Sequence, residues 1–511
     1  MQKKNLILFV LILLKFVLQY SLISSEYELH RDEFLHLDQG KHLAWGFISV
    51  PPVSSWFAYL ILQLGNSVFW VKFFPALLGA LTMLVIWKII EELKGNLFAL
   101  ILGTIAILFS VILRLNILFQ PNSFDVLIWT TIILVIVKYA NSEQNKWLYI
   151  LGILFAIGFL NKYNVVFLLL GLLPAIIFSE HRKIFTNKHL YFALLLSFIL
   201  VSPNLIWQYQ NGFPVFYHIN ELKETQLVNV NRLDFVKEQL LFFIGSVYVL
   251  IASLIAFWTY KPFQKFRFLF WTFFGTLALF IYLKAKGYYA IGLYPAYFAF
   301  GAVYIEYLLQ DSWKKYLKPV AIVVPIIVFI PIVNIIFPNM SPAEIQLQSK
   351  KFKDLGLLRW EDGKEHTMPQ DFADMLGWKE LADKVALAYE SLATDSNSQT
   401  IIWCDNYGQA GAINFYLHDK NIQAYSLNAD YIDWIPLDKK IQHVILVQDQ
   451  TDDDPERKRE ASLFESVAFF GEITNPYSRE QHTKIYVLKN ATADINRIIK
   501  EEIEETKKSQ Q

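Results

Sequence analysis

Long apolar runs separated by short polar turns occupy the first two-thirds of the chain. A helix that crosses a membrane needs about 20 apolar residues, and about eleven segments of this kind follow one another as far as Phe337. They lie near residues 5–23, 67–87, 97–113, 123–139, 147–160, 163–178, 190–207, 239–258, 268–283, 290–309 and 319–337. We therefore expect a mostly α-helical, polytopic membrane bundle over residues 1–338, with about ten to thirteen spans. Residues 24–66 form its first outer loop and carry interfacial helices.

After Pro338 the composition turns charged. Residues 371–389 show the spacing of an amphipathic helix. Three later apolar runs, at 400–404, 444–447 and 484–488, are typical of strands that alternate with helices. This alternation predicts that residues 339–511 form a soluble α/β domain with a largely parallel sheet. The turn at 406–411 suits either a phosphate at a helix N-terminus or a plain tight turn.

Basic residues near the helix ends indicate the orientation in the membrane. Lys3 and Lys4 precede a run that resembles a signal peptide without a cleavage site, which we interpret as an uncleaved first helix. The same side then collects Lys88, Lys94, Lys138, Lys146, Arg182, Lys183, Lys188, Lys261, Lys265, Arg267, Lys314, Lys315 and Lys318. This alternation predicts a cytoplasmic N-terminus and places the C-terminal domain on the outer side, which in a bacterium is the periplasm.

Composition agrees with a membrane protein. Apolar residues make up 54% of the 511 positions, and the mean hydropathy is +0.33. The net charge is zero and no basic tract stands out, which argues against a nucleic-acid partner. Cys404 is the one cysteine, so an intramolecular disulfide is excluded. His30, His36 and His42 share no helix face, and we expect them to be interface residues rather than metal ligands.

An acidic pair follows the first helix at once. Asp32 and Glu33 lie close to the point where the chain leaves the bilayer, and ionisable groups held there are functional candidates. A structural role is the alternative, because acids favour the first turn of a helix and residues 34–47 suit a short interfacial helix. For Asp125, several roles stay open: pairing with Lys162, orienting an acceptor, helping to hold a divalent ion, or capping its own helix.

Several cations fall on the outer side, against the charge bias. They are Arg31, Lys41, Arg114, Lys162, Lys284 and Lys286. Some anchor helix ends by extending to the lipid headgroups. Three of them, Lys162, Lys284 and Lys286, share short outer turns with the aromatics Tyr163, Tyr288 and Tyr289. These cations suit an anionic headgroup or a phosphate leaving group, and the tyrosines suit either a sugar or lipid contact or the aromatic belt of the interface.

Four outer segments, taken in order, match one family. They are Arg31-Asp32-Glu33 through Ala44-Trp45-Gly46 to Pro51-Pro52, then Pro121-Asn-Ser-Phe-Asp125, Asn161-Lys162-Tyr163, and Lys284-Ala-Lys286-Gly287-Tyr288-Tyr289 with Tyr294-Pro295. The set resembles the glycosyltransferases with the GT-C fold. Within them it is similar to the bacterial branch related to dolichyl-phosphate-mannose protein mannosyltransferases and the aminoarabinose lipid A transferase. The resemblance covers roughly residues 1–310.

The resemblance implies that a sugar is taken from a polyprenyl-phosphate carrier at the outer face. It implies that Asp32 is the catalytic base and Glu33 its neighbour, to which we add Asp125 as a further candidate. The candidates for the donor phosphate are Lys162, Lys284, Lys286 and Arg31. Two departures count against lipid A as acceptor: the stretch 49–52 lacks the acidic-basic pair that precedes the prolines of aminoarabinose transferases, and Leu35-His36 replaces their basic-aromatic pair.

Transfer from a phosphate carrier needs a carboxylate that accepts the proton of the acceptor hydroxyl and cations that stabilise the departing phosphate. We therefore expect an inverting glycosyltransferase of the bacterial inner membrane that moves a hexose or pentose to a protein, lipid or polysaccharide of the cell envelope. This chemistry requires no cofactor, although a divalent cation, Mg²⁺ or Mn²⁺, stays open. The alternative function is a transporter or flippase of a lipid-linked glycan, which internal repeats and mid-membrane charges would favour.

Overall fold

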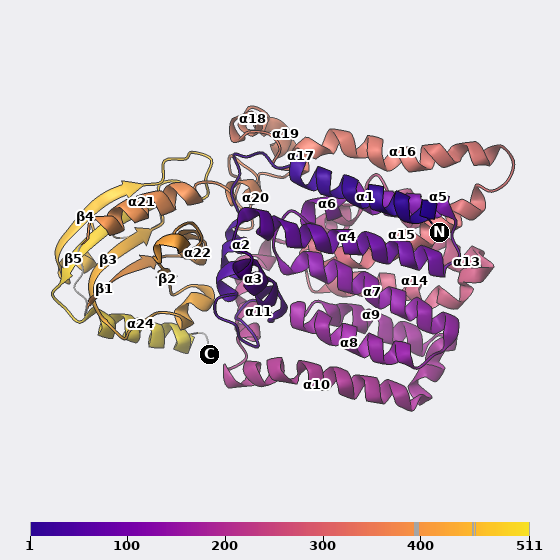
Figure 1. Cartoon of the computed structure of the whole chain (residues 1–511), viewed down its shortest axis with the longest axis horizontal. Helices are drawn as coiled ribbons and strands as arrows, with labels where there is room; N and C mark the ends of the chain where they lie inside the picture. Colours follow the sequence, from indigo (N-terminus) through magenta and orange to yellow (C-terminus); the bar gives the residue numbers. More distant parts are fainter. Residues whose placement is uncertain (1, 393–397, 452–453, 455, 510–511) are drawn as a thin grey trace.

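The molecule consists of a long helical bundle and a sheet-containing part at one end of it (Figure 1). The computed structural model describes residues 2–392, 398–451, 454 and 456–509. Two short helices within residues 24–66, α2 (Arg31–Gln39) and α3 (Val53–Gln63), lie at the end of the bundle that faces the sheet. The loop with the acidic pair therefore lies where the two parts meet.

Each long apolar segment of the sequence coincides with helix in the bundle. The other α-helices of this part are α1 (Gln2–Ser21), α4 (Val68–Glu92), α5 (Leu97–Leu108), α6 (Val111–Leu115), α7 (Pro121–Ser142), α8 (Lys146–Asn161), α9 (Val165–Ile177), α10 (Lys188–Gln210), α11 (Pro214–Thr225), α12 (Arg232–Leu241), α13 (Val247–Thr259), α14 (Arg267–Tyr282), α15 (Tyr294–Leu308), α16 (Lys318–Phe329) and α17 (Val333–Ile336). The 3₁₀ segments are η1 (Glu180–Thr186), η2 (Leu227–Asn229), η3 (Lys261–Phe266), η4 (Gly287–Leu293), η5 (Ser312–Leu317) and η6 (Ile330–Ile332). The mostly helical fold class is confirmed.

Within the described residues, six helices are long and apolar enough to cross a membrane, and the number rises to eight if each of two bent helix pairs is one span. The six are Lys3–Ser21, Val68–Glu92, Pro121–Ser142, Lys188–Gln210, Lys261–Tyr282 and Trp313–Ile336. Shorter apolar helices such as α5 and α8 lie among them. A multi-pass membrane protein is the class that these helices indicate, whereas the count of about eleven spans stays a prediction.

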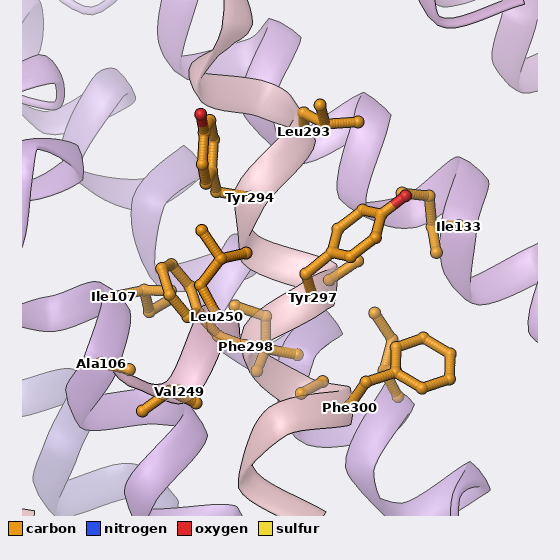
Figure 2. Close-up of a cluster of buried hydrophobic side chains, with 14 of the residues drawn as sticks. Ala106, Ile107, Ile133, Val249, Leu250, Leu293, Tyr294, Tyr297, Phe298 and Phe300 are labelled. Atoms are coloured by element: carbon orange, nitrogen blue, oxygen red, sulfur yellow. The ribbon is translucent and has the colours of Figure 1, made fainter. Parts of the chain in front are cut away.

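The bundle is packed around α15, in which every residue from Tyr294 to Glu306 is buried. Figure 2 shows Tyr294, Tyr297, Phe298 and Phe300 among aliphatic side chains of α5, α7 and α13. An apolar helix that is enclosed on all sides belongs to the core of a bundle. By contrast, α10 and α16 bury few side chains, so their apolar surfaces are available to lipid.

The sheet has five strands in the order β2-β1-β3-β5-β4. They are β1 (Ser398–Cys404), β2 (Ala424–Ser426), β3 (Lys440–Gln448), β4 (Phe464–Glu472) and β5 (Lys484–Ala491). Strand β1 runs parallel to β2 and β3, whereas β5 runs antiparallel to β3 and β4. The expected largely parallel sheet is thus wrong for two of the four pairings. The pairing of β4 with β5 is antiparallel because the connection between these two strands contains no crossover helix.

Helices cover this sheet and link it to the bundle. They are α18 (Pro342–Leu347), α19 (Ser349–Asp354), α20 (Gln370–Ala373), α21 (Trp378–Glu390), α22 (Tyr407–Tyr416), α23 (Lys458–Ala461) and α24 (Ile495–Ser509), with the 3₁₀ turns η7 (His418–Lys420) and η8 (Ala429–Asp433). The single helix expected over 371–389 is divided at Gly377 into α20 and α21. The turn after β1 is a capped helix start, since the Asn406 side chain accepts hydrogen bonds from Gly408 N and Gln409 N.

Helix α2 is held tightly against α22. Phe34 of α2 is fully buried, with its ring centre 5.8 Å from that of Trp378 and 5.7 Å from that of Phe415. A Cβ atom on Gly411 would lie only 2.7 Å from Phe34 Cβ and 2.6 Å from the Tyr431 hydroxyl. Only glycine allows the two helices to approach this closely. The C-terminal part is therefore packed onto the helix that carries the acidic pair.

Candidate active site at the junction of the two parts

Helix α2 begins where the sequence places its acids. The His30 backbone N–H donates to Glu33 Oε2 at 2.7 Å, and the Asp32 backbone N–H donates to His30 Nδ1 at 3.2 Å, which closes a capping box. Such reciprocal bonds satisfy donors that a helix start leaves free. The Glu33 side chain is therefore part of the helix cap, whereas the side chain of Asp32 is not.

Asp32 keeps part of its carboxylate accessible. Its Oδ1 accepts a hydrogen bond from the Tyr407 hydroxyl at 2.7 Å, and its Oδ2 accepts one from Gln120 Nε2 at 3.0 Å, while the side chain stays 38% exposed. Burial by itself raises the pKa of Asp32, but His30, Arg31 and the Tyr407 hydroxyl together outweigh burial and hold that pKa well below its usual range. The carboxylate is ionised and within reach of a ligand.

Arg31 completes this contact from the other side. Its Nε and Nη2 donate to the Tyr407 hydroxyl oxygen at 2.9 and 2.5 Å, and its guanidinium carbon lies 4.5 Å from the centre of the Tyr407 ring. The cation is half-buried between α2 and α22. It is thus bound by the C-terminal part of the chain rather than held free for a phosphate.

Glu33 has a different environment from its neighbour. It is fully buried, and Lys72 Nζ lies 2.6 Å from its Oε2 while the Phe119 backbone N–H donates to its Oε1 at 2.7 Å. With the capping bond to His30, every side of this carboxylate has a partner. These contacts fasten α2 to α4 and to the turn before α7, which is a structural position.

A second group of candidates lies around Lys162, directly after α8. Its Nζ donates to Asn122 Oδ1 at 2.7 Å and lies 4.3 Å from the centre of the Tyr289 ring and 5.2 Å from that of Tyr288. Asp125 is 4% exposed, accepts a hydrogen bond from Asn164 Nδ2 at 3.0 Å and interacts electrostatically with Lys162. The Asp125 carboxylate is therefore bound between helices.

Tyr288 connects the two groups. Burial and then Tyr289 raise the pKa of its hydroxyl well above the ordinary value, and the charges of Glu361 and Asp32 raise it further. The same ring faces the Lys162 ammonium. The structure thus brings Asp32, Tyr288 and Lys162 into one region at the sheet-facing end of the bundle.

Lys286 belongs to the same region but is already paired. Its ammonium, 15% exposed, forms an ion pair with Glu361 and a hydrogen bond with Gln226 Oε1. Glu361 lies at the tip of a small hairpin that the bridge between Arg359 and Glu365 closes. A carboxylate of the linker between bundle and sheet therefore occupies the position expected for a phosphate.

Two further candidates lie apart from this group. The Tyr163 hydroxyl donates to Asn204 Oδ1 at 3.1 Å and accepts from Gln208 Nε2 at 3.0 Å, so it binds α10. Lys284 occupies a tight turn with a positive φ of 53° and is half-buried. No contact of the described residues connects either side chain to Asp32.

The histidines of α2 and its flanks have partners from the protein. His30 caps the helix, His36 Nδ1 lies 2.9 Å from Gln39 Oε1, and His42 stacks on Trp434 with 4.2 Å between ring centres. The described residues contain no group of three or more His, Cys, Asp or Glu side chains that could hold a metal ion.

Several residues of this region escape prediction from the sequence. Gln120 and Lys72 lie in the turn before α7 and within α4, and Lys72 at least interrupts an apolar run, which is a recognisable signal. Tyr407 and Glu361 gave no such signal. Tyr407 lies 375 positions beyond its partner Asp32, and Glu361 lies 75 positions beyond its partner Lys286.

Comparison with known proteins agrees with the geometry. The family model "Dolichyl-phosphate-mannose-protein mannosyltransferase" matches residues 49–207. The crystal structure of ArnT from Cupriavidus metallidurans bound to undecaprenyl phosphate superposes with a TM-score of 0.62 at 11% identity, and the match covers 94% of this chain and 97% of ArnT. The apo structure of the same ArnT gives a TM-score of 0.61, also at 11% identity and with the same coverage. No curated protein sequence matches the chain.

These matches confirm the resemblance that the four outer segments indicated. The family model contains the second and third of those segments and the Pro51-Pro52 end of the first, and the structural likeness extends over the sheet as well as the bundle. At 11% identity the likeness to ArnT shows a common fold and nothing more. The chain is a membrane protein with the GT-C fold seen in ArnT, and its residues 49–207 are similar to the dolichyl-phosphate-mannose-protein mannosyltransferases.

Proposed function

We propose that the protein is an inverting glycosyltransferase that moves a sugar from a polyprenyl-phosphate donor to an acceptor at the outer face of the membrane. One observation carries the proposal. The ionised, partly exposed carboxylate of Asp32 shares a region with the Lys162 ammonium, and Tyr288 interacts with both.

The chemistry needs a base and a site for the leaving phosphate. In this proposal Asp32 accepts the proton of the acceptor hydroxyl as that oxygen attacks the anomeric carbon, and the bond from this carbon to the phosphate oxygen breaks. Lys162 and Lys286 stabilise the charge that develops on the departing phosphate. A single displacement of this kind inverts the configuration at the anomeric carbon.

The two lysines are available to different degrees. Lys162 is held by one neutral amide and two aromatic rings, so it reaches a phosphate without losing an ion pair. Lys286 has to exchange Glu361 for the phosphate. We therefore assign the first contact to Lys162 and propose that Lys286 joins after the exchange.

The comparisons support the donor class. The ArnT structure contains undecaprenyl phosphate, and the matching family is described by a dolichyl-phosphate sugar donor. Undecaprenyl and dolichyl phosphates are both polyprenyl phosphates, so their common chemistry is a monophosphate on a long apolar chain. The apolar surfaces of α10 and α16 are open to lipid and suit a chain of that kind. The inner membrane of a bacterium, with the sheet in the periplasm, is the location that we propose.

The transporter alternative has less support. Transport of a lipid-linked glycan places ionisable groups near the middle of the bilayer on both sides of a pathway. Here the candidates Asp32, Lys162 and Lys286 lie together where bundle and sheet meet. This arrangement favours chemistry at one surface.

The experiment measures the release of polyprenyl phosphate by the purified protein from polyprenyl-phosphate hexoses and pentoses. Wild type is expected to release the lipid phosphate. In Asp32→Asn the rate of release is expected to fall by about 100- to 10,000-fold, the usual contribution of a general base. Asp234→Asn, a 56% exposed acid whose partner Lys237 is 70% exposed, is the control and keeps the rate. Normal turnover in Asp32→Asn rules out the base. No turnover in wild type, together with movement of labelled lipid across proteoliposomes, establishes transport instead.

A further inference from the structure

We infer that Tyr407, supplied by the C-terminal part of the chain, is a positioning residue of this site, because its hydroxyl holds the Asp32 carboxylate on one side and the Arg31 guanidinium on the other. The inference rests on the proposed function, in which Asp32 is the base. It gives the C-terminal part a direct role in the chemistry.

The hydroxyl of Tyr407 uses its full bonding capacity. It donates its one proton to Asp32 Oδ1 at 2.7 Å, and its oxygen accepts from Arg31 Nε at 2.9 Å and Nη2 at 2.5 Å. A tyrosine hydroxyl has one donor and two acceptor positions. Because both acceptor positions are used by a cation, the proton is directed at the carboxylate.

The backbone of α22 places this hydroxyl. Tyr407 is the first residue of the helix, directly after the capping residue Asn406, and Gly408 follows it. A Cβ atom on Gly408 would lie 2.4 Å from Arg31 Cγ, so glycine lets the arginine side chain lie along the helix start. The contact is therefore built into the interface between α2 and α22.

The second carboxylate oxygen of Asp32 has its hydrogen-bond donor in the helical bundle. Gln120 Nε2 donates to Oδ2 at 3.0 Å, so each carboxylate oxygen is held by a different part of the molecule. Two fixed donors set the orientation of the carboxylate and favour its ionised form before an acceptor hydroxyl arrives. Loss of the tyrosine donor removes one of these two constraints on the Asp32 carboxylate.

A purely structural role is the competing explanation, and the chain offers a matched control for it. Tyr431 is fully buried whereas Tyr407 is half-buried, but the Tyr431 hydroxyl likewise donates to a carboxylate of helix α2, Asp38 Oδ2, at 2.6 Å. Tyr431→Phe therefore removes an equivalent hydroxyl from the same interface without touching Asp32. Tyr407→Phe keeps the ring that stacks on Arg31 and removes only the oxygen.

The test compares the two variants by steady-state kinetics of polyprenyl-phosphate release. In Tyr407→Phe, kcat is expected to fall about 10- to 100-fold, the equivalent of one hydrogen bond to a charged group. The donor KM stays within about twofold, because the donor phosphate is bound elsewhere. Tyr431→Phe leaves both constants near wild type. Equal behaviour of the two variants, or a change in the donor KM alone, overturns the inference.

A double variant tests whether Tyr407 acts through Asp32. Asp32→Glu shifts the carboxylate and lowers kcat without abolishing turnover. In this background Tyr407→Phe is expected to lower kcat by less than about threefold, because the contact between the two side chains is already broken. Full additivity of the two effects overturns the inference. If wild type turns over no lipid-phosphate sugar, the proposed function itself falls, and this outcome is distinct from a failure of Tyr407 alone.

Discussion

Lys72 Nζ of α4 lies 2.6 Å from Glu33 Oε2 of α2, and neither side chain is more than 8% exposed. The pair joins the sheet-facing end of α4 to the helix that carries the candidate base. It also explains why two adjacent acids have different environments, since Glu33 faces the bundle while Asp32 faces the junction with the sheet.

Removal of one partner from this pair is expected to destabilise the protein strongly. Lys72→Met leaves an uncompensated buried carboxylate, which costs about 3–5 kcal/mol of unfolding free energy. Thermal unfolding in detergent measures the change. Lys237→Met is the control, because its pair with Asp234 is 70% and 56% exposed and contributes about 1 kcal/mol or less. Equal midpoints for the two variants contradict the structural position of Glu33.

The ion pair between Lys286 and Glu361 leads to a prediction about donor affinity. Glu361→Gln frees the Lys286 ammonium for the donor phosphate, so the donor KM is expected to fall by up to about fivefold, the value of one partly exposed ion pair. Glu365→Gln is the control on the same hairpin, since its pair with Lys353 is exposed on both sides. A rise of the donor KM in Glu361→Gln shows instead that this carboxylate contributes to donor binding.

Asp430 gives the junction a pH dependence. Its Oδ2 accepts from Gln39 Nε2 at 2.8 Å and its Oδ1 accepts from the Ile48 backbone N–H at 2.7 Å, and burial raises its pKa to about 6 despite these bonds. The unfolded chain has a pKa of about 3.9 at this residue. The native state therefore holds the proton more tightly between these values, and stability is lost as the pH rises through about 6.

The expected loss from this residue is at most about 3 kcal/mol. It is measured as the difference between wild type and Asp430→Asn in unfolding midpoint from pH 4 to pH 7. The two curves should diverge across this interval, whereas Asp419→Asn, which replaces an 88% exposed acid, should run parallel to wild type. Parallel curves for Asp430→Asn contradict a buried proton at this position.

The close approach of α2 and α22 gives a steric prediction. Gly411→Ala adds a Cβ atom that meets Phe34 Cβ at 2.7 Å and the Tyr431 hydroxyl at 2.6 Å, so the helices have to separate. Overpacking of this kind costs about 1–3 kcal/mol. Gly471→Ala is the control, because its nearest neighbour is 3.8 Å away. The measurement is limited proteolysis of the linker after Pro338, which should accelerate in Gly411→Ala alone.

The positions of the membrane helices could be predicted because lipid burial imposes a long apolar run on each of them. The order of the motifs also singled out Asp32, whose role as the base stays a prediction. Its partners could not be predicted, because Tyr407 is 375 positions away and nothing in its local sequence indicates which surface it meets. The direction of β5 was missed for a related reason, since an isolated strand pattern carries no information on its neighbours.

Glu33 shows a different limit of sequence analysis. Its position next to Asp32 suggested a shared role, but the direction of each side chain depends on the turn of α2 and on Lys72 from another helix. Lys162, Tyr288 and Tyr289 were expected together on the basis of short outer turns, and their ring contacts agree with that expectation. Their functional roles stay predictions until the variants are measured.

The fit between α2 and α22 also constrains how such proteins diverge. A chimera that exchanges the sheet-containing part between two relatives replaces Tyr407, Gly408 and Gly411 while keeping the α2 against which they pack. We expect such exchanges to succeed only if α2 is exchanged together with α22, although Arg31 and Tyr407 lie 376 positions apart in the sequence.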